Sequence, residues 1–301
     1  MSAHTDSPRG ILAGASAFLA WGLSAIYWKA LAHVPAYEIL CHRIVWSLAF
    51  TALLLLLRGG LGETLGALKN RRTLALLAAS AALVSVNWFL FIWAVTAGYV
   101  LETSLGYYLT PQVNVLLGCL VLGERPRRLQ WAALGLACAG VLNMVLLYGE
   151  FPWVAVGLAA SFGLYGLVRK VVAVGPLPGL FVETALASVP AVAWLASVHR
   201  AGGGAFGALG TGTDALLLGA GVLTTLPLLC FTFAARRITM VTLGLLQYIA
   251  PTCFFLLGTL AYHEPFTTAH AATFALIWAG IGLFVVEGVI LRRRERRALG
   301  G

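Results

Sequence analysis

The sequence predicts an all-α, polytopic membrane protein with ten transmembrane helices, arranged as two inverted five-helix repeats. Three observations support this fold class: a very apolar composition, ten long apolar runs and an internal repeat. Sixty per cent of the 301 residues are hydrophobic, 10% are charged and the mean hydropathy is +0.90. A water-soluble domain of this size would leave much of that apolar surface in water. The solvent around this chain is therefore predicted to be lipid.

Ten apolar runs are predicted to be the transmembrane helices. A spanning helix needs ~20 mostly apolar residues, and a helix satisfies the backbone hydrogen bonds that lipid cannot. The runs cover residues 10–32, 38–57, 73–97, 101–122, 128–147, 153–172, 179–198, 214–235, 241–262 and 269–291. They follow one another too closely for an extramembrane domain to fit between them. The first run is longer than the apolar region of a signal peptide, so it is predicted to be a spanning helix.

The distribution of Lys and Arg predicts the orientation of the helices. With ten spans, seventeen of the 20 cationic residues fall on one side, Lys29 and Arg200 fall on the other, and Arg43 lies within a span. Lys and Arg concentrate on the cytoplasmic side of membrane proteins, so both termini are predicted to be cytoplasmic. The net charge of +9 then reflects topology and anionic lipid headgroups. No nucleic-acid partner is expected, because the charges are scattered over short segments.

The two halves of the chain repeat each other at a shift of 140 residues. Matching pairs include Phe91 and Phe231, Tyr108 and Tyr248, Pro111 and Pro251, and Glu124 and Glu264. Each half holds five spans, an odd number, so the halves are predicted to lie in opposite orientations. The predicted parts are a cytoplasmic tail at 1–9, a first repeat at 10–148, a second repeat at 152–291 and a basic cytoplasmic tail at 292–301.

Several motifs in these runs resemble the EamA branch of the drug/metabolite transporter superfamily and, within it, the RarD group of bacterial permeases. They are Tyr27-Trp28-Lys29, Glu38-Ile39-Leu40-Cys41-His42-Arg43, Asn87-Trp88-Phe89-Leu90-Phe91, Glu102-Thr103-Ser104-Leu105-Gly106-Tyr107-Tyr108, Pro111-Gln112-Val113-Asn114, Leu122-Gly123-Glu124-Arg125 and Gln247-Tyr248-Ile249-Ala250-Pro251. The resemblance spans residues 10 to about 290. The sequence departs from the family pattern at Gln112, where an aliphatic residue is more usual, and at His263, where glycine is more usual.

The resemblance implies a permease of the bacterial inner membrane. Its central cavity would be lined by helices one to four and six to nine, with the fifth and tenth helices peripheral. The implied substrate is a small organic solute, which could be a metabolite, an amino acid-like compound or a drug. The sequence has no P-loop, so transport would be secondary rather than ATP-driven.

Two alternatives to transport remain open at this point. A membrane-embedded enzyme is disfavoured because aspartate occurs only at Asp6 and Asp214, which leaves no acidic pair for a metal-diphosphate site. A purely structural membrane protein is the other alternative. The five cysteines lie in apolar runs and the histidines lack metal-ligand spacing. We therefore expect no cofactor and no metal.

Ionisable residues within spans are the first candidates for function, because burying a charge in lipid is costly. Arg43 lies in the second run and Glu183 in the seventh. Arg43 is predicted either to contact the solute or to form an ion pair with Glu102, which begins the fourth run. The possible partners of Glu183 are Arg169, Lys170 and Arg236. A role for Glu183 in proton coupling is a hypothesis.

Polar and aromatic side chains complete the predicted cavity. The fourth run carries a polar stripe at helical spacing, the ninth run repeats it, and either stripe could line a cavity or bond to neighbouring helices. The predicted cavity residues are Trp21, His42, Arg43, Asn87, Trp88, Tyr107, Tyr108, Gln112, Asn114, Tyr165, Glu183, Gln247 and Tyr248. Pro111, Pro227 and Pro251 are predicted points of helix bending. Trp28, near a helix end, is assigned to an interfacial aromatic belt.

Small residues in the fifth and tenth runs permit close helix approach. They are Gly135, Ala139, Gly140, Ala279, Gly280 and Gly282. They suit either packing within one chain or a homodimer contact.

Overall fold

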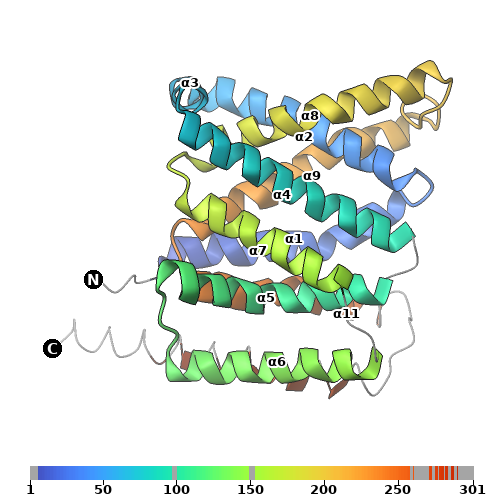
Figure 1. The fold of residues 1–301 in the computed structure, drawn as a ribbon. Helices are drawn as coiled ribbons and strands as arrows, with labels where there is room; N and C mark the ends of the chain where they lie inside the picture. Colours follow the sequence, from blue (N-terminus) through green and yellow to red (C-terminus); the bar gives the residue numbers. More distant parts are fainter. Residues whose placement is uncertain are drawn as a thin grey trace.

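The computed structural model describes residues 6–96, 100–148 and 153–257, together with short pieces between 260 and 290. Within these residues the regular structure is helical throughout, in a layered bundle (Figure 1). The helices are α1 (Pro8–Ala30), α2 (Ala36–Arg58), α3 (Leu61–Lys69), α4 (Arg71–Thr96), α5 (Val100–Leu122), α6 (Arg128–Tyr148), α7 (Trp153–Val171), α8 (Pro176–Arg200), α9 (Thr211–Ala235), α10 (Met240–Gln247) and α11 (Ile249–Leu256).

Helices long and apolar enough to cross a membrane make up most of this bundle. By length and composition, six of the described helices qualify, namely α1, α2, α4, α7, α8 and α9. The described apolar parts of α5 and of α10–α11 are shorter, at Gly106–Leu122 and Met240–Cys253. The prediction of an all-α, polytopic membrane protein is therefore confirmed.

The helix boundaries agree closely with the first nine predicted spans, with two differences. The short helix α3 (Leu61–Lys69) was not expected, and the ninth span is divided into α10 and α11 at Tyr248. The predicted tenth span, 269–291, falls largely outside the described residues. The count of ten helices, the inverted repeat and the two tails therefore stay predictions.

The division at Tyr248 has a local cause in Pro251. Proline has no backbone N–H, so the carbonyl of Gln247, four residues earlier, receives no helical hydrogen bond from it. The N–H of Tyr248 instead bonds the carbonyl of Leu245 at 3.4 Å, a tighter turn. By contrast α5 continues through Pro111 without interruption. The two repeat-related prolines therefore have different effects on their helices.

Glycines allow several helices to pack with their backbones close together. A Cβ atom at Gly221 of α9 would clash with the backbone of Trp46 in α2, and one at Gly244 of α10 would lie 2.8 Å from the carbonyl oxygen of Pro111 in α5. Such contacts are how membrane helices gain packing energy where lipid removes the hydrophobic driving force.

Helix α6 lies at the edge of the bundle (Figure 1), next to α5. A Cβ atom at Gly280 would lie 2.8 Å from the carbonyl oxygen of Ala133 in α6. Gly280 therefore serves packing within the chain. A Cβ at Gly135 or Gly282 would meet no atom within 4 Å among the described residues.

Candidate functional site

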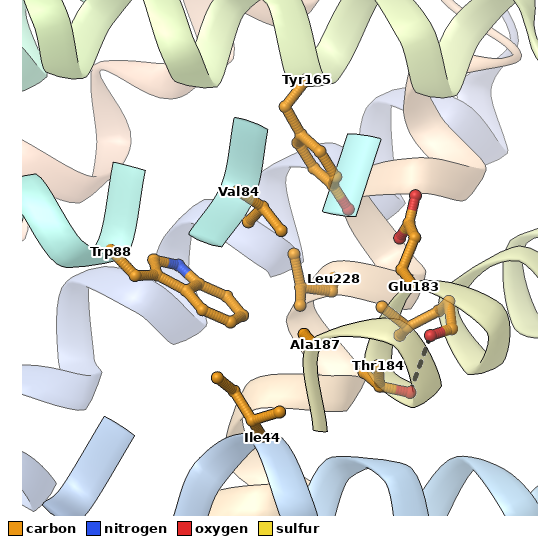
Figure 2. A pocket seen from close by; sticks show the side chains of 9 residues that line it. Ile44, Val84, Trp88, Tyr165, Glu183, Thr184, Ala187 and Leu228 are labelled. Atoms are coloured by element: carbon orange, nitrogen blue, oxygen red, sulfur yellow. Dashed lines mark hydrogen bonds between the residues drawn. The ribbon is translucent and has the colours of Figure 1, made fainter. Parts of the chain in front are cut away.

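A small cavity lies where five helices meet, and nine side chains line it (Figure 2). They are Ile44 of α2, Val84 and Trp88 of α4, Tyr165 of α7, Leu180, Glu183, Thr184 and Ala187 of α8, and Leu228 of α9. The space left between them suffices for about one water molecule. The wall is mainly apolar, with polar groups on α7 and α8. Three predicted cavity residues, Trp88, Tyr165 and Glu183, line this space.

Glu183 is held in the interior by two donors from other helices. Its Oε1 accepts hydrogen bonds from Ser80 Oγ of α4 at 2.5 Å and from Arg169 Nη1 of α7 at 3.2 Å. Glu183 is 2% exposed and Arg169 is fully buried. The second carboxylate oxygen, Oε2, is buried and has no protein partner among the described residues. Of the three partners considered for Glu183 from the sequence, the structure selects Arg169.

The remaining nitrogens of Arg169 are bonded as well. Its Nε lies 3.4 Å from Thr232 Oγ1 of α9, and its Nη2 donates to the carbonyl of Pro176 at 3.3 Å. The Glu183–Arg169 pair thus joins α4, α7, α8 and α9 through buried polar contacts. A buried guanidinium with this many acceptors is compensated for much of its lost hydration.

Arg43 of α2 lies between two indole rings. Its Cζ is 4.3 Å from the ring centroid of Trp88 in α4 and 5.1 Å from that of Trp28 in α1. Its Nε donates to Thr224 Oγ1 of α9 at 3.1 Å. A guanidinium stacked on aromatic faces is stabilised by cation–π attraction. Trp28, assigned from the sequence to a membrane belt, is half-buried and also contacts this guanidinium.

One further described group bears on the charge of Arg43. The hydroxyl of Tyr107 in α5 lies within electrostatic range of the guanidinium. The side chain of Glu102 lies outside the described residues, so the predicted Arg43–Glu102 pair stays a prediction. Among the described residues, no carboxylate lies within 4 Å of Arg43.

An aromatic cluster extends from the cavity towards α1. Tyr165 stacks on Phe231 with centroids 5.8 Å apart, and Trp21 contacts Phe231 and Phe162 at 5.7 Å each. Trp21 is thus linked to the cavity through these rings and does not itself line the cavity.

Two further predicted cavity residues make other contacts. Asn87 of α4 donates to the carbonyl of Leu158 at 2.9 Å and to Ser161 Oγ at 3.0 Å, which ties α4 to α7. His42 stacks on Phe206 of the loop between α8 and α9, with centroids 5.3 Å apart. Neither residue belongs to the described cavity wall.

The polar stripes of α5 and α10 meet each other. Asn114 Nδ2 donates to Gln247 Oε1 at 2.7 Å, and both side chains are buried. Tyr108 and Tyr248 pack in a cluster with residues of α6, away from the described cavity. The side-chain amide of Gln112 is buried, and neither its nitrogen nor its oxygen meets a partner at hydrogen-bond geometry among the described residues.

Two carboxylates from distant parts of the chain accept hydrogen bonds from backbone N–H groups at the beginning of α10. Glu124, in the loop between α5 and α6, accepts from the backbone N–H groups of Met240 at 2.9 Å and Val241 at 3.1 Å. Asp6 accepts from the N–H of Thr239 at 2.7 Å. Carboxylates favour this position because the N-terminus of a helix carries partial positive charge and unpaired donors. Lys170 Nζ lies 3.8 Å from Glu124 Oε1.

Sequence reasoning missed four side-chain partners of Glu183, Arg169 and Arg43: Ser80, Thr224, Thr232 and Trp28. A serine or threonine inside an apolar run bonds its own helix as readily as a neighbour, so the sequence alone gives it no distinct signal. Asp6 and Glu124 could have been singled out from the sequence, because acidic residues are rare in this chain. Their shared partner, the beginning of α10, could not, because it is far from both in sequence.

Comparisons with known proteins agree with the fold and with a membrane transporter family. A model of the EamA-like transporter family matches residues 8–146. An uncharacterized transporter of Vibrio cholerae is 47% identical, and the match covers 97% of each chain. The protein RarD of Salmonella typhi is 43% identical over 95% of this chain and 98% of its own length. The chloramphenicol-sensitive protein RarD of Pseudomonas aeruginosa is 30% identical over 97% and 99%.

A solved structure described only as "crystal structure of protein" supports the fold. It has a TM-score of 0.71 and 20% identity, and the match covers 91% of this chain and 96% of that one. With full-length relatives well above 30% identity, the chain belongs to the EamA-like transporter family, as a membrane transporter of the RarD type.

Proposed function

We propose that this protein moves a small organic solute across the bacterial inner membrane by alternating access, without ATP, through the cavity between α2, α4, α7, α8 and α9. The observation that carries the proposal is the buried carboxylate on the wall of this cavity. Glu183 Oε2 has no partner in the described protein although the surrounding wall is mainly apolar. Ionisable groups at such depth are costly to bury and usually mark a solute or ion pathway.

The pattern of helix contacts supports a two-repeat architecture for this pathway. Under the predicted duplication, α7 corresponds to α1, α9 to α4, and α10–α11 to α5. Helix α1 packs on α9, α10 and α11, and α7 packs on α4 and α5. Each contact thus has its counterpart, as two homologous halves in opposite orientation require. We infer that the cavity lies at the interface of these halves.

The contacts at the beginning of α10 support a closed state on the basic face, which is the predicted cytoplasmic face. They join Asp6, the loop with Glu124, Lys170 of α7 and α10. Alternating access requires these contacts to separate when the cavity opens to that side. Both termini would lie on this side, and the bilayer covers the apolar outer surface. A homodimer through α6 and 269–291 is a further proposal, for which α6 offers the exposed side chains of Trp131, Leu142 and Leu146.

Solute flux in proteoliposomes tests the proposed pathway. Ala187 lines the cavity, whereas its neighbour Leu186 is 40% exposed on the outside of α8. The side chain that Ala187→Trp introduces is much larger than the space in the present conformation, so it obstructs the pathway and is expected to reduce flux at least about tenfold, an effect of ~1.4 kcal/mol or more. Leu186→Trp is the matched control and should leave flux near the wild-type value. Equal flux in both variants would place the pathway elsewhere.

A proton-coupling role for Glu183 is a separate hypothesis within this function. Glu183→Gln keeps the shape and still accepts hydrogen bonds from Ser80 and Arg169, but it cannot take up a proton. If Glu183 couples transport to protons, flux in the variant becomes independent of an imposed pH gradient. An unchanged response to the gradient refutes this role without touching the proposed pathway.

A further inference from the structure

Two guanidinium groups lie within the described bundle, and they are bonded very differently. Arg169 is paired with Glu183 and donates from three nitrogens. Arg43 stacks on two indoles, donates from Nε to Thr224, and meets no carboxylate within 4 Å among the described residues. Arg43 also keeps some accessible surface, whereas Arg169 is fully enclosed. Of the two, Arg43 is therefore the one without a described ion-pair partner.

The surroundings of Arg43 fix the direction in which it offers its remaining donors. The Cζ of Arg43 lies over the rings of Trp88 and Trp28, and the bond to Thr224 occupies its Nε. The terminal edge formed by Nη1 and Nη2 is the part that these three contacts leave for a ligand, with the hydroxyl of Tyr107 within electrostatic range. That edge is the fork that binds a carboxylate through two parallel hydrogen bonds.

The lining of the neighbouring cavity indicates what kind of group the rest of a bound carboxylate ligand would be. Trp88 forms both one face of the Arg43 site and part of the cavity wall, and Ile44, next to Arg43 in sequence, also lines the cavity. Val84 and Leu228 continue an apolar surface from there. At the opposite part of the wall, Glu183 would repel a second negative charge.

We propose that Arg43 binds the carboxylate of the transported solute and that the solute is a monocarboxylate with an apolar body held in the adjoining cavity. This inference rests on the proposed transport function. In the present conformation the cavity has room for about one water molecule. The solute therefore binds when the helices move apart, as alternating access requires. Trp28 and Trp88 hold the guanidinium in position so that little ordering is needed on binding.

Binding of matched probes to the purified full-length protein tests this proposal. The probes are 3-phenylpropanoate and its neutral amide, 3-phenylpropanamide, measured by calorimetry in lipid nanodiscs. Wild-type protein should bind the carboxylate at least about tenfold more tightly than the amide. Arg43→Gln should abolish this preference by weakening carboxylate binding, with amide binding unchanged. Arg200→Gln is the control, because it removes the same charge from an exposed position at the end of α8.

A second variant keeps the test informative if Arg43→Gln fails to fold. Arg43→Lys retains the charge and loses the fork, so it should still weaken carboxylate binding severalfold. The proposal is overturned if Arg43→Gln or Arg43→Lys binds the carboxylate as wild type does, or if the wild type shows no preference for it. A purely structural Arg43–Glu102 pair predicts instead that Arg43→Gln and Glu102→Gln destabilise the protein equally and leave the preference intact, which also overturns the proposal.

The experiment separates this proposal from the proposed function. Flux of a neutral solute that Ala187→Trp blocks, together with an unaltered carboxylate preference in Arg43→Gln, would uphold the pathway and reject Arg43 as the anion site. Binding that depends on Arg43 without flux of either probe in proteoliposomes would uphold the anion site and reject transport of these solutes.

Discussion

The two charged positions on α2 and α8 differ in how the protein compensates them. Arg43 lies seven residues after the first residue of α2, Ala36, and Glu183 lies seven residues after the first residue of α8, Pro176. Each is therefore about 10 Å along its helix. Glu183 is enclosed with an oppositely charged partner, whereas Arg43 is held by two aromatic faces and one hydroxyl.

This difference separates a charge held by an ion pair from a charge held by aromatic rings. Breaking a buried ion pair leaves one charge without compensation, which costs far more than the pair itself contributes. A cation stacked on indoles loses no charged partner when it is replaced. We therefore expect substitutions at the α8 site to affect folding first, and substitutions at the α2 site to affect ligand binding first.

The largest expected effect is the loss of Arg169. Arg169→Met leaves Glu183 buried without its cation and should lower the free energy of unfolding by ~3–5 kcal/mol. Arg43→Met should cost much less, because no described carboxylate is left behind. Unfolding of both variants in mixed micelles, followed by circular dichroism, measures the difference. Similar losses in the two variants would remove the distinction drawn between the sites.

A smaller effect is expected where α9 approaches the helix of Arg43. Gly221→Ala forces α9 away from the Trp46 backbone, and overpacking of this kind costs ~1–3 kcal/mol. Because the same movement separates Thr224 from Arg43, carboxylate binding should weaken as well. Gly212→Ala, on the same helix with no atom within 4 Å of its added Cβ, is the control. The same micelle unfolding assay applies, and equal stability of the two variants would contradict the close α2–α9 packing.

The smallest expected effect compares the hydroxyl that serves each charge. Ser80→Ala removes the donor to Glu183 and should lower stability by ~0.6–2 kcal/mol. Thr224→Val keeps the size of the side chain and removes the acceptor for Arg43, so it should weaken carboxylate binding while stability changes little. Calorimetry measures carboxylate binding and the unfolding assay measures stability, and both are applied to both variants. A loss of stability in Thr224→Val as large as in Ser80→Ala would assign a structural role to both sites.

The sequence predicted the spans well because each depends on one local property, a long apolar run. It did not predict α3, because Leu61–Lys69 is short and lies in a segment that reads as a loop. It also did not predict the division at Tyr248, since Pro111 occupies the matching position and leaves α5 continuous. The consequence of a proline depends on neighbouring helices that can replace the lost hydrogen bond.

The candidate site was predicted only in part, for a related reason. Arg43 and Glu183 stand out in any apolar run, but their partners depend on which helix faces which. Arg169 was one of three possible partners for Glu183, and Trp28 was assigned to the membrane interface rather than to Arg43. Asn87 and Gln247 were predicted to line the cavity, and in the structure they bond to neighbouring helices and are not part of the described cavity wall. Spacing along one helix identifies a face but not what covers that face.

The contact between Asp6 and Thr239 has a consequence for biogenesis. The bond joins residues 233 positions apart, so the ribosome must complete at least the first 239 of the 301 residues before the bond can form. Contacts of such long sequence separation form late because the intervening chain must first be ordered. During synthesis, the N-terminal end of α1 therefore lacks this contact until Thr239 has been made. The contact can form only once the beginning of α10 is in place.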